Sequence, residues 1–502
     1  MELEFKQTEL PHLKCIMQEV RYQEETGEAI VPDSYPDIGS IIDSFAVVIL
    51  RGKDLREGSI TVSGGIKGGV LYQPEDETGL KNLDFYLPFT LKMDHSKITE
   101  NTKVICSVCV RSVDGRMINS RKAMLRAELG CHVTAYESTK LQLFELQKRS
   151  DDLQLLSQTY DIHLPLETSE KAFTIVDSMQ LPSDLPSIDR ICKHFCRLDL
   201  TDRKVVGNKG VFKGIAMSKL LYLSENDELC VYEQQIPFSQ YCEFTSDQDE
   251  EVLSVVPVMT GYDLELTSQE PIRSAQVTIH ILAQGIISGT HTVTLTEDAF
   301  STSEDLTPAW QEFELTCQLD RRSAQHLVRC HTGGDISRCI DTDIYVGFPA
   351  FERTDRSICS KLPIKVHAII NSNGSISGAI SKTELVQETA VSPQAQCAMQ
   401  VDSIEIAETV LLTDGMETRC NIQTKAIFYT EQVMKSLCGG TLEEPDSSRE
   451  KASSVILKRI PADTPLWDIA KKYRTKPHAI QVVNHLNEEI LPEDCVLLIP
   501  IG

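Results

Sequence analysis

Several features that mark common protein classes are missing from this sequence of 502 residues. Lys and Arg number 49 against 74 Asp and Glu, a net charge of -25, so the chain has no basic excess to bind a phosphate backbone or an acidic lipid surface. The longest apolar runs, such as Phe45–Leu50, have about six residues, whereas a membrane-spanning helix needs about 20. We therefore expect no nucleic acid partner and no membrane insertion.

An export signal is missing as well. The N-terminus, Met1-Glu2-Leu3-Glu4-Phe5-Lys6, lacks the basic start and the apolar core of a secretory signal. We therefore expect a cytoplasmic protein, in which the 16 cysteines are reduced thiols. Most of them stand singly among apolar residues, where a thiol serves as a small apolar side chain.

Motifs of catalysis are also missing. The chain has no Gly-x-x-x-x-Gly-Lys-Ser/Thr loop, no Gly-x-Ser-x-Gly elbow and no His-Glu-x-x-His. The spacings Cys106-x-x-Cys109 and Cys192-x-x-x-Cys196 each offer two thiols, whereas a structural zinc site needs four ligands. We therefore expect a binding protein that is not an enzyme, with no metal and no cofactor.

The sequence does contain a repeat of about 150 residues. Shifted by this length, the segment Val31-Pro-Asp-Ser-Tyr-Pro-Asp-Ile38 aligns with Leu181-Pro-Ser-Asp-Leu-Pro-Ser-Ile188, and both prolines coincide. Further along, Gly64 meets Gly214 inside a strand pattern. This recurrence favours a bulge or close backbone packing over a phosphate-binding loop for the glycines at 64–69.

A third copy of the repeat is weaker, because neither proline survives in it. The segment Ile364–Ile370 follows the apolar rhythm of Ile215–Leu221, and Arg419 is placed as Arg121 and Arg273 are. The sequence therefore predicts three tandem modules, over residues 1–150, 151–295 and 296–435.

Within the repeats, segments such as Ile60–Ser63 and Lys425–Tyr429 are rich in β-branched and aromatic residues, and short polar turns such as 225–228 suit antiparallel hairpins. We therefore predict a mainly β fold built from tandem modules. Directly after the prolines, Ile38–Ile42 and Ile188–Phe195 fit a short helix that opens behind a proline, so one helix is expected in each module.

The last part of the chain has a different character. Residues 436–452 are polar, with two glycines and a proline, which predicts a flexible linker. Residues 453–502 carry six basic and six acidic side chains, so the whole net charge of -25 belongs to the first 452 residues. The C-terminal segment is electrostatically a separate unit.

The C-terminal fifty residues show the pattern strand, helix, helix, strand. Thr464 is a good N-cap and Pro465 a good first residue for one helix, while Pro477 opens a second helix with Ile480 and Val483 facing inward. A closing strand follows at Cys495–Pro500. The sequence therefore predicts a small βααβ domain.

This segment resembles a LysM domain. The matching residues are Asp463-Thr464-x-Leu466-Trp467-x-Ile469-Ala470-x-x-Tyr473, then Ile480, Asn484 and Leu497-Leu498-Ile499-Pro500. LysM domains commonly bind N-acetylglucosamine-containing glycans in a shallow groove between two loops. The resemblance implies a partner-binding or glycan-binding groove formed by Asp463, Thr464, Pro465, Asn484, His485 and Leu486. Trp467 fits either a sugar-stacking position or the small core, and we favour the core.

The repeats resemble a second family, the SPOCS module of spore-coat assembly proteins of the SpoVID/SipL type. The resemblance is carried by the Val-Pro-Asp-x-x-Pro-Asp-Ile element, by Val70-Leu71-Tyr72 and by Leu87-Pro88-Phe89. Several such modules followed by one LysM domain is the arrangement of SipL-like proteins.

The two resemblances together imply a non-enzymatic scaffold for spore coat assembly. It would act in the mother-cell cytoplasm at the forespore surface, where its LysM domain docks the coat morphogenetic ATPase and its modules meet other coat proteins. The alternative is a carbohydrate-binding protein whose LysM domain recognises peptidoglycan.

Overall fold

The computed structural model describes residues 2–75, 79–148, 150–245, 252–268, 270–444 and 454–501. Nearly all of these residues lie in antiparallel strands, and the two helices of the described chain are short and close to its C-terminal end. The predicted mainly β class is confirmed. Strands rich in apolar and β-branched residues bury one face of each sheet against another.

The first module consists of two three-stranded sheets, with strand orders β1-β6-β5 and β2-β3-β4. Buried side chains from both sheets, such as Ile60 and Val62 of one and Leu125 and Leu129 of the other, form one core. The strands are β1 (Phe5–Ile30), β2 (Ile38–Arg56), β3 (Ser59–Pro74), β4 (Lys81–Asp94), β5 (Lys103–Asn119) and β6 (Lys122–Leu146).

The same strand order recurs in the second module, whose sheets are β7-β12-β11 and β8-β9-β10. As in the first module, the first strand pairs with the last. The strands are β7 (Leu153–Gln180), β8 (Ile188–Val206), β9 (Lys209–Ser224), β10 (Leu229–Glu243), β11 (Val252–Leu266) and β12 (Ser274–Ser301).

The third module repeats the order with one addition. Its sheets are β13-β19-β18 and β14-β16-β17, and a short extra strand, β15, also pairs with β16. The strands are β13 (Asp305–Gly333), β14 (Arg338–Val346), β15 (Ala350–Arg353), β16 (Ser357–Ser372), β17 (Ser375–Ala390), β18 (Gln396–Leu412) and β19 (Gly415–Glu443).

Two predicted boundaries differ from the observed strands. The boundary at 295/296 falls inside β12, which ends at Ser301, and the predicted linker over 436–452 begins inside β19, which runs to Glu443. Leu437 and Leu442 are buried there, because each pairs across the ribbon with β13 and packs its side chain inward. The remainder of that predicted linker, 445–452, lies outside the described residues.

The helix expected after each proline pair is wrong. Ile38 and Ile188 open the long strands β2 and β8 instead. The backbone of each of these strands pairs with the adjacent strand, β3 or β9, and Phe45–Leu50 is buried on both faces of its sheet. Tertiary pairing and β-branched side chains thus outweigh a local sequence that also fits the first turn of a helix.

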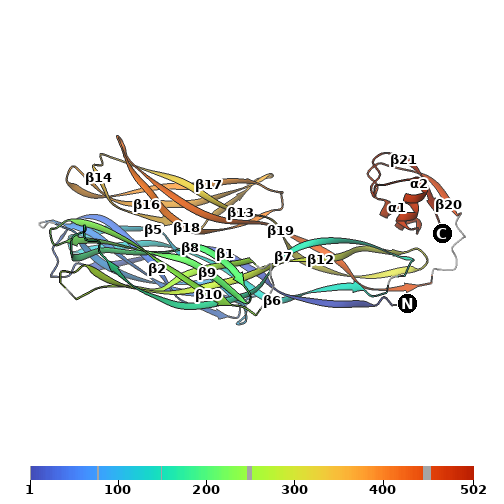
Figure 1. Cartoon of the computed structure of the whole chain (residues 1–502), viewed down its shortest axis with the longest axis horizontal. Coiled ribbons are helices and arrows are strands. Elements are labelled where there is room, and N and C mark those ends of the chain that lie inside the picture. The colour runs from blue at the N-terminus through green and yellow to red at the C-terminus, as the bar shows by residue number, and fades with distance from the viewer. Residues whose placement is uncertain are drawn as a thin grey trace.

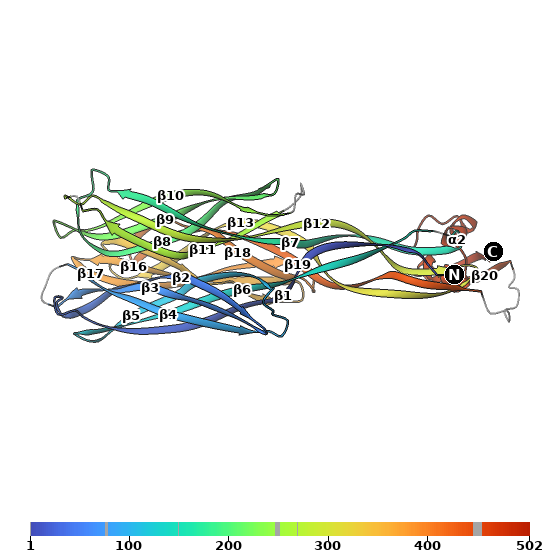
Figure 2. The same ribbon diagram turned by 90° about the horizontal axis from the view of Figure 1, so that it is seen from below.

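The three modules surround a common axis. Strand β2 of the first module contacts β11 of the second, β8 of the second contacts β18 of the third, and β14 of the third contacts β5 of the first. Corresponding strands thus make corresponding contacts in cyclic order, and the modules close into a ring with pseudo-threefold symmetry (Figures 1 and 2). We call this ring the head.

Long ribbons project from one end of the head and form a stalk (Figure 1). It consists of residues 5–15 with 136–146, 153–165 with 288–301, and 305–317 with 430–443. Apolar residues of the three ribbons meet in a core of its own, made of Leu141, Ile162, Leu164, Val293, Leu295, Phe313, Leu315 and Met434. The N-terminus lies at the end of the stalk.

The tail, residues 454–501, has the predicted βααβ order, with β20 (Val455–Ile460), α1 (Leu466–Tyr473), α2 (Pro477–Asn484) and β21 (Cys495–Pro500). Two details differ from the prediction. Pro465, not Thr464, occupies the N-cap position of α1, and the Thr464 hydroxyl donates to the backbone of Pro461 instead. Val483 is 43% exposed, because only Ile480 of α2 reaches the small core.

Candidate functional site

The proline element of the first module is held by one arginine. Arg121, directly before β6, donates hydrogen bonds to the backbone oxygens of Val31 (2.9 Å), Pro32 (3.0 Å) and Tyr35 (2.8 Å) and to a carboxylate oxygen of Asp37 (3.0 Å). Hydrogen bonds from Ser120 and then from Arg121 hold the pKa of Asp37 below its usual range. The element is therefore a rigid turn whose carbonyl groups are satisfied from within the module.

The second module uses the same device with fewer contacts. Arg273 donates to the backbone oxygens of Pro182 (2.7 Å) and Leu185 (2.9 Å). A tyrosine completes both turns, since the hydroxyl of Tyr72 donates to Pro36 O and that of Tyr222 to Pro186 O. The repeated Pro, Tyr and Arg positions thus serve one structural purpose.

The glycine and Pro-Phe motifs of the repeat are cross-strand partners. Gly64 of β3 lies opposite Phe89 of β4, and Gly214 of β9 lies opposite Phe238 of β10. A Cβ atom at Gly64 would stand 2.6 Å from the Phe89 ring, and one at Gly214 would stand 2.3 Å from the Phe238 ring. These distances agree with close packing, which is one of the two reasons predicted for these glycines.

Charged side chains from all three modules meet at the axis of the head. Lys193 of β8 lies 2.7 Å from Asp43 of β2 and 2.9 Å from Asp341 of β14, and it also pairs with Asp343. Lys219 of β9 pairs with the same two β14 carboxylates, at 2.7 Å from Asp341. All five side chains are buried, and we call them the axial cluster.

Mutual attraction favours the charged forms of Asp43, Asp341, Lys193 and Lys219. Burial opposes the charge on Asp43 and Asp341, but Lys193 and His367 outweigh it at Asp43, and Lys193 and Lys219 outweigh it at Asp341, so the pKa of each carboxyl lies below its usual range. Burial also opposes the charge on Lys193, yet Asp341, Asp343 and Asp43 raise its pKa well above the usual value. Such a cluster is costly to break, because removing one partner leaves buried charge uncompensated.

The predicted groove residues of the tail lie in two loops that are joined by backbone hydrogen bonds. Asp463 N donates to Leu491 O (2.8 Å), and Leu466 N donates to Glu489 O (2.8 Å). The loop of Asp463, Thr464 and Pro465 is thus brought against the loop that follows α2. Asp463 is exposed, whereas Thr464 and Pro465 are half-buried.

The other three predicted groove residues differ in availability. Asn484 is committed to the fold, because its amide donates to Ile480 O and Leu498 O and its carbonyl accepts from Leu498 N, all within 2.8 Å. His485, exposed, caps α2 in the left-handed conformation, and Leu486 packs partly against the tail core. Asn484 therefore connects α2 to β21 and has little capacity left for a ligand.

One face of α1 rests on the stalk. The indole of Trp467 packs edge-on against Phe300 at 4.9 Å between ring centroids, and its Nε1 donates to Asp298 (2.8 Å). Lys471 binds both oxygens of Asp298, at 2.6 and 2.7 Å, and Arg474 pairs with Asp305. Phe300 belongs to the same buried cluster as the tail core, and Trp467, half-buried, packs against that cluster where the tail meets the stalk. The core position favoured from the sequence is therefore met in part, and the core extends into the stalk.

The outer face of the tail sheet is apolar and open. Leu457 of β20 and Leu498 of β21 are cross-strand partners, 67% and 40% exposed, and Val455 and Val496 flank them at 51% and 57%. An exposed cluster of large apolar side chains on a small domain is typical of a protein interaction surface. We call these four residues the tail face.

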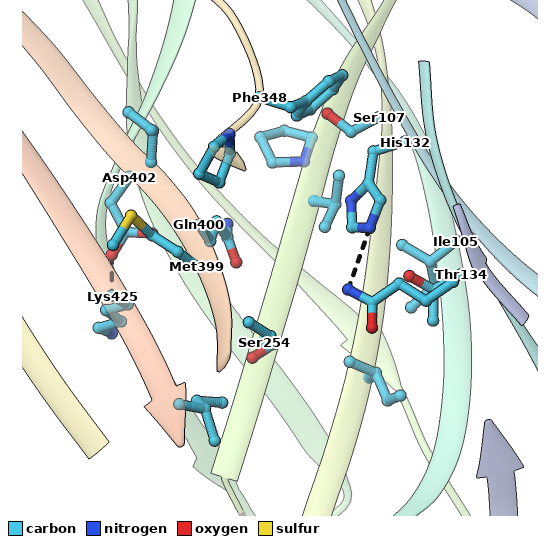
Figure 3. Close-up of a pocket in the computed structure, with 18 of the residues that line it drawn as sticks. Ile105, Ser107, His132, Thr134, Ser254, Phe348, Met399, Gln400, Asp402 and Lys425 are labelled. Atoms are coloured by element: carbon cyan, nitrogen blue, oxygen red, sulfur yellow. Dashed lines mark hydrogen bonds and ion pairs between the residues drawn. The ribbon is translucent and has the colours of Figure 1, made fainter. Parts of the chain in front are cut away.

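A cavity of about 1100 Å³ lies where the head meets the stalk. Strands of all three modules line it, including the sheet edges β5, β11 and β18. In Figure 3, Ser107, His132 and Thr134 stand on one wall, Asp402 and Lys425 stand across from them, and Ser254 and Gln400 lie between. No sequence motif pointed to this cavity, because its walls come from strands far apart in the chain.

The described residues contain no group of three or more side chains arranged to hold a metal ion. Cys192 and Cys196 are both buried in β8, and the thiol of Cys106 faces that of Cys131 at 3.8 Å. All 16 cysteines are free thiols. Within the described ranges, neither helix is long and apolar enough to cross a bilayer.

Comparison with protein families gives a match in the second module. Residues 187–259 match the SipL, SPOCS domain family. The SPOCS segment runs from the end of the second proline turn through β8, β9 and β10 into β11, and it contains Gly214, Tyr222 and Phe238. It supports a SipL-like family, while the LysM resemblance of the tail and the SPOCS resemblance of the other two modules stay predictions. The comparison with curated proteins gave no match.

Proposed function

We propose that this chain is a non-enzymatic scaffold of spore coat assembly. The SPOCS segment is the observation that carries the proposal. The strand order around that segment recurs in the first and third modules, which favours one kind of module in three copies. A ring of such modules on a stalk presents several surfaces at fixed relative positions, as a scaffold requires.

In this proposal the tail docks the coat morphogenetic ATPase at the forespore surface, in the mother-cell cytoplasm. The tail face suits a protein partner, because covering four exposed apolar side chains removes apolar surface from water and so lowers the free energy. The α1 side of the tail is already occupied by the stalk. The tail face is therefore the surface we assign to the ATPase.

The test is a pull-down of the full-length chain with the coat ATPase. Leu457→Glu places a charge at the centre of the tail face and is expected to reduce capture at least tenfold. Because Leu457 is 67% exposed, the substitution leaves the core untouched. The control is Leu327→Glu on β13, at a head residue that is 54% exposed. Equal capture of both variants and the parent chain contradicts the assignment.

The alternative function is recognition of peptidoglycan by the tail. The joined loops of Asp463 and Leu491 favour it, because they bring the predicted groove residues together. Titration calorimetry of the full-length chain with chitin oligomers separates the two functions. Micromolar binding that is weakened by His485→Ala supports glycan recognition. Absence of binding at millimolar oligomer contradicts it.

A further inference from the structure

The central cavity has the character of a small-molecule site. Its volume of about 1100 Å³ lies just above the usual range for such sites, which are mostly apolar with a few polar groups. The apolar part of its wall includes Val48, Phe195, Val256, Val258 and Met399. Burial lowers the pKa of His132 and raises that of Tyr136, so these two polar rings are uncharged at neutral pH.

One side of the cavity is basic, although the protein as a whole is acidic. Arg203 and Lys425 both lie beside Asp402, with Arg203 Nη2 at 2.8 Å and Lys425 Nζ at 3.9 Å from a carboxylate oxygen. Arg321 also lines the cavity there and interacts with both cations. The exposed Asp202 is the other carboxylate close to Lys425. On this side of the cavity, the three cations Arg203, Arg321 and Lys425 thus outnumber the two carboxylates Asp202 and Asp402.

Arg321 is the cation that lacks a counterion. Among the described residues it forms no ion pair, and burial followed by repulsion from Arg203 lowers the pKa of its guanidinium. Burial and then Arg321 also lower the pKa of the neighbouring His163 to about 4, so His163 is neutral at pH 7. A half-buried guanidinium without a carboxylate favours an anion in the cavity beside it.

The cavity reaches solvent at the base of the stalk. Val433 and Glu314 line it there, and Val433 is 69% exposed while the Glu314 side chain is 66% exposed. A ligand can therefore enter between the head and the stalk without opening the ring.

Each sheet edge along the cavity has at least one backbone group that already bonds a side chain of a neighbouring module, which disfavours an added peptide strand. The amide of Gln284 pairs with both Cys106 N (2.9 Å) and Cys106 O (2.7 Å) on the edge of β5. Gln400 donates to Val255 O on β11, and Asp199 accepts from Ile404 N on β18. Side chains of neighbouring modules thus take some of the positions that a bound strand would use.

We infer that the cavity binds an amphipathic anion of the fatty-acid type. The hydrocarbon body lies against the apolar wall, and the carboxylate accepts hydrogen bonds from Arg321. Neither the tail nor the coat ATPase takes part, so this inference is independent of the proposed function.

The test is calorimetric titration of the full-length chain with dodecanoate below its micelle concentration. Saturable binding of one dodecanoate per chain is expected, with 1-dodecanol binding at least tenfold more weakly because it lacks the charge. Arg321→Gln is expected to weaken dodecanoate binding at least tenfold. The matched control is Arg322→Gln on the same strand, at an arginine that pairs with Asp320 (2.7 Å) and does not line the cavity.

A second variant tests the inference independently, in case Arg321→Gln does not fold. Ser254→Trp fills part of the cavity from β11, and it is expected to abolish dodecanoate binding while circular dichroism and the melting temperature stay close to those of the parent. No saturable binding to the parent chain overturns the inference. Equal binding by the parent and Arg321→Gln, or by the parent and a folded Ser254→Trp, overturns it as well.

Discussion

At the residue scale, the recurring Arg and Tyr of the first two modules satisfy the backbone of a turn, whereas Arg419, aligned with these arginines in the third copy, lies inside β19 and pairs with Glu408 and Glu417. These recurring residues therefore have a structural role in the proline turns. They are Arg121, Arg273, Tyr72 and Tyr222. A buried carbonyl without a donor costs free energy, and charged donors make the stronger hydrogen bonds. The recurrence of these residues was visible in the sequence, but their partners were not, because each partner lies 36 or more residues away in the chain.

Arg121→Met is expected to lower the free energy of unfolding by about 1–2 kcal/mol, because three backbone oxygens and Asp37 lose a charged donor. Arg273→Met is expected to cost less, since Arg273 contacts two carbonyls. Urea titration followed by circular dichroism measures both effects. Arg126→Met, which removes a surface pair with Glu24, is the control and should stay below about 1 kcal/mol. Equal losses in all three variants would show that the turn contacts contribute nothing beyond surface charge.

At the element scale, the sequence predicts a strand correctly where the local pattern determines the secondary structure. The errors occur where pairing with a distant segment determines it. Ile60–Ser63 lies in β3 and Lys425–Tyr429 in β19, as their β-branched composition predicts. The segment Ile38–Ile42 fits a helix equally well in isolation, and only pairing with β3 settles it as strand. The same limit applies to the last residues of β19. Their composition is typical of a linker, but Leu437 and Leu442 are buried in the stalk.

The tail shows how far a family pattern carries a site prediction. The βααβ order and the meeting of the two loops agree with the LysM resemblance. The pattern does not reveal that the amide of Asn484 is hydrogen-bonded to β21, because its partner Leu498 lies 14 residues further along the chain. Nor does it reveal the contact of Trp467 with Asp298, which depends on the fold of the stalk.

At the scale of the whole molecule, the axial cluster explains why the ring closes in one order. Asp43, Lys193 and Asp341 each directly follow a register shift near the start of β2, β8 and β14, strands that correspond in the three modules. Three identical modules would bring three like charges together at this point. Divergence to Asp, Lys and Asp converts that repulsion into attraction between different modules, so the copies are complementary and not interchangeable.

Lys193→Met is therefore expected to destabilise the head by about 3–5 kcal/mol, since Asp43, Asp341 and Asp343 stay buried with one cation fewer. Lys204→Met, at an exposed lysine on the same strand, is the matched control and should change stability by less than about 0.5 kcal/mol. Urea titration at pH 7 measures both variants. A loss in Lys193→Met no larger than that of the control contradicts the role of the cluster.

Acid provides a second check on the cluster. The pKa values of Asp43 and Asp341 are held below their usual range, so their contribution to stability is complete above the unfolded value of about 3.9 and declines as pH falls below it. A protonated carboxyl is neutral, so its burial does not require the positive charge of Lys193. The difference in stability between the parent and Lys193→Met is therefore expected to shrink as pH falls through about 4, and a difference that grows with acid contradicts this account.

The contact between tail and stalk joins a neutral domain to an acidic body, and we expect it to depend on salt. Asp298, Asp305, Lys471 and Arg474 are all at least partly exposed, so their pairs weaken as ionic strength rises. The chain has two tryptophans, and Trp310→Phe leaves Trp467 as the sole reporter of the contact. Its emission is expected to shift to the red when salt rises from 0.05 to about 1 M, because the indole leaves Phe300 and Asp298 for water.

Asp298→Asn should produce the same shift already at low salt, since it removes the acceptor charge for Lys471 and weakens the bond from Trp467 Nε1. Glu312→Gln, at an exposed glutamate on β13, is the control and should leave the emission unchanged. If Trp467 emission in Asp298→Asn equals that of the parent at every salt concentration, the ion pairs do not hold the tail, and the apolar contact with Phe300 carries it alone.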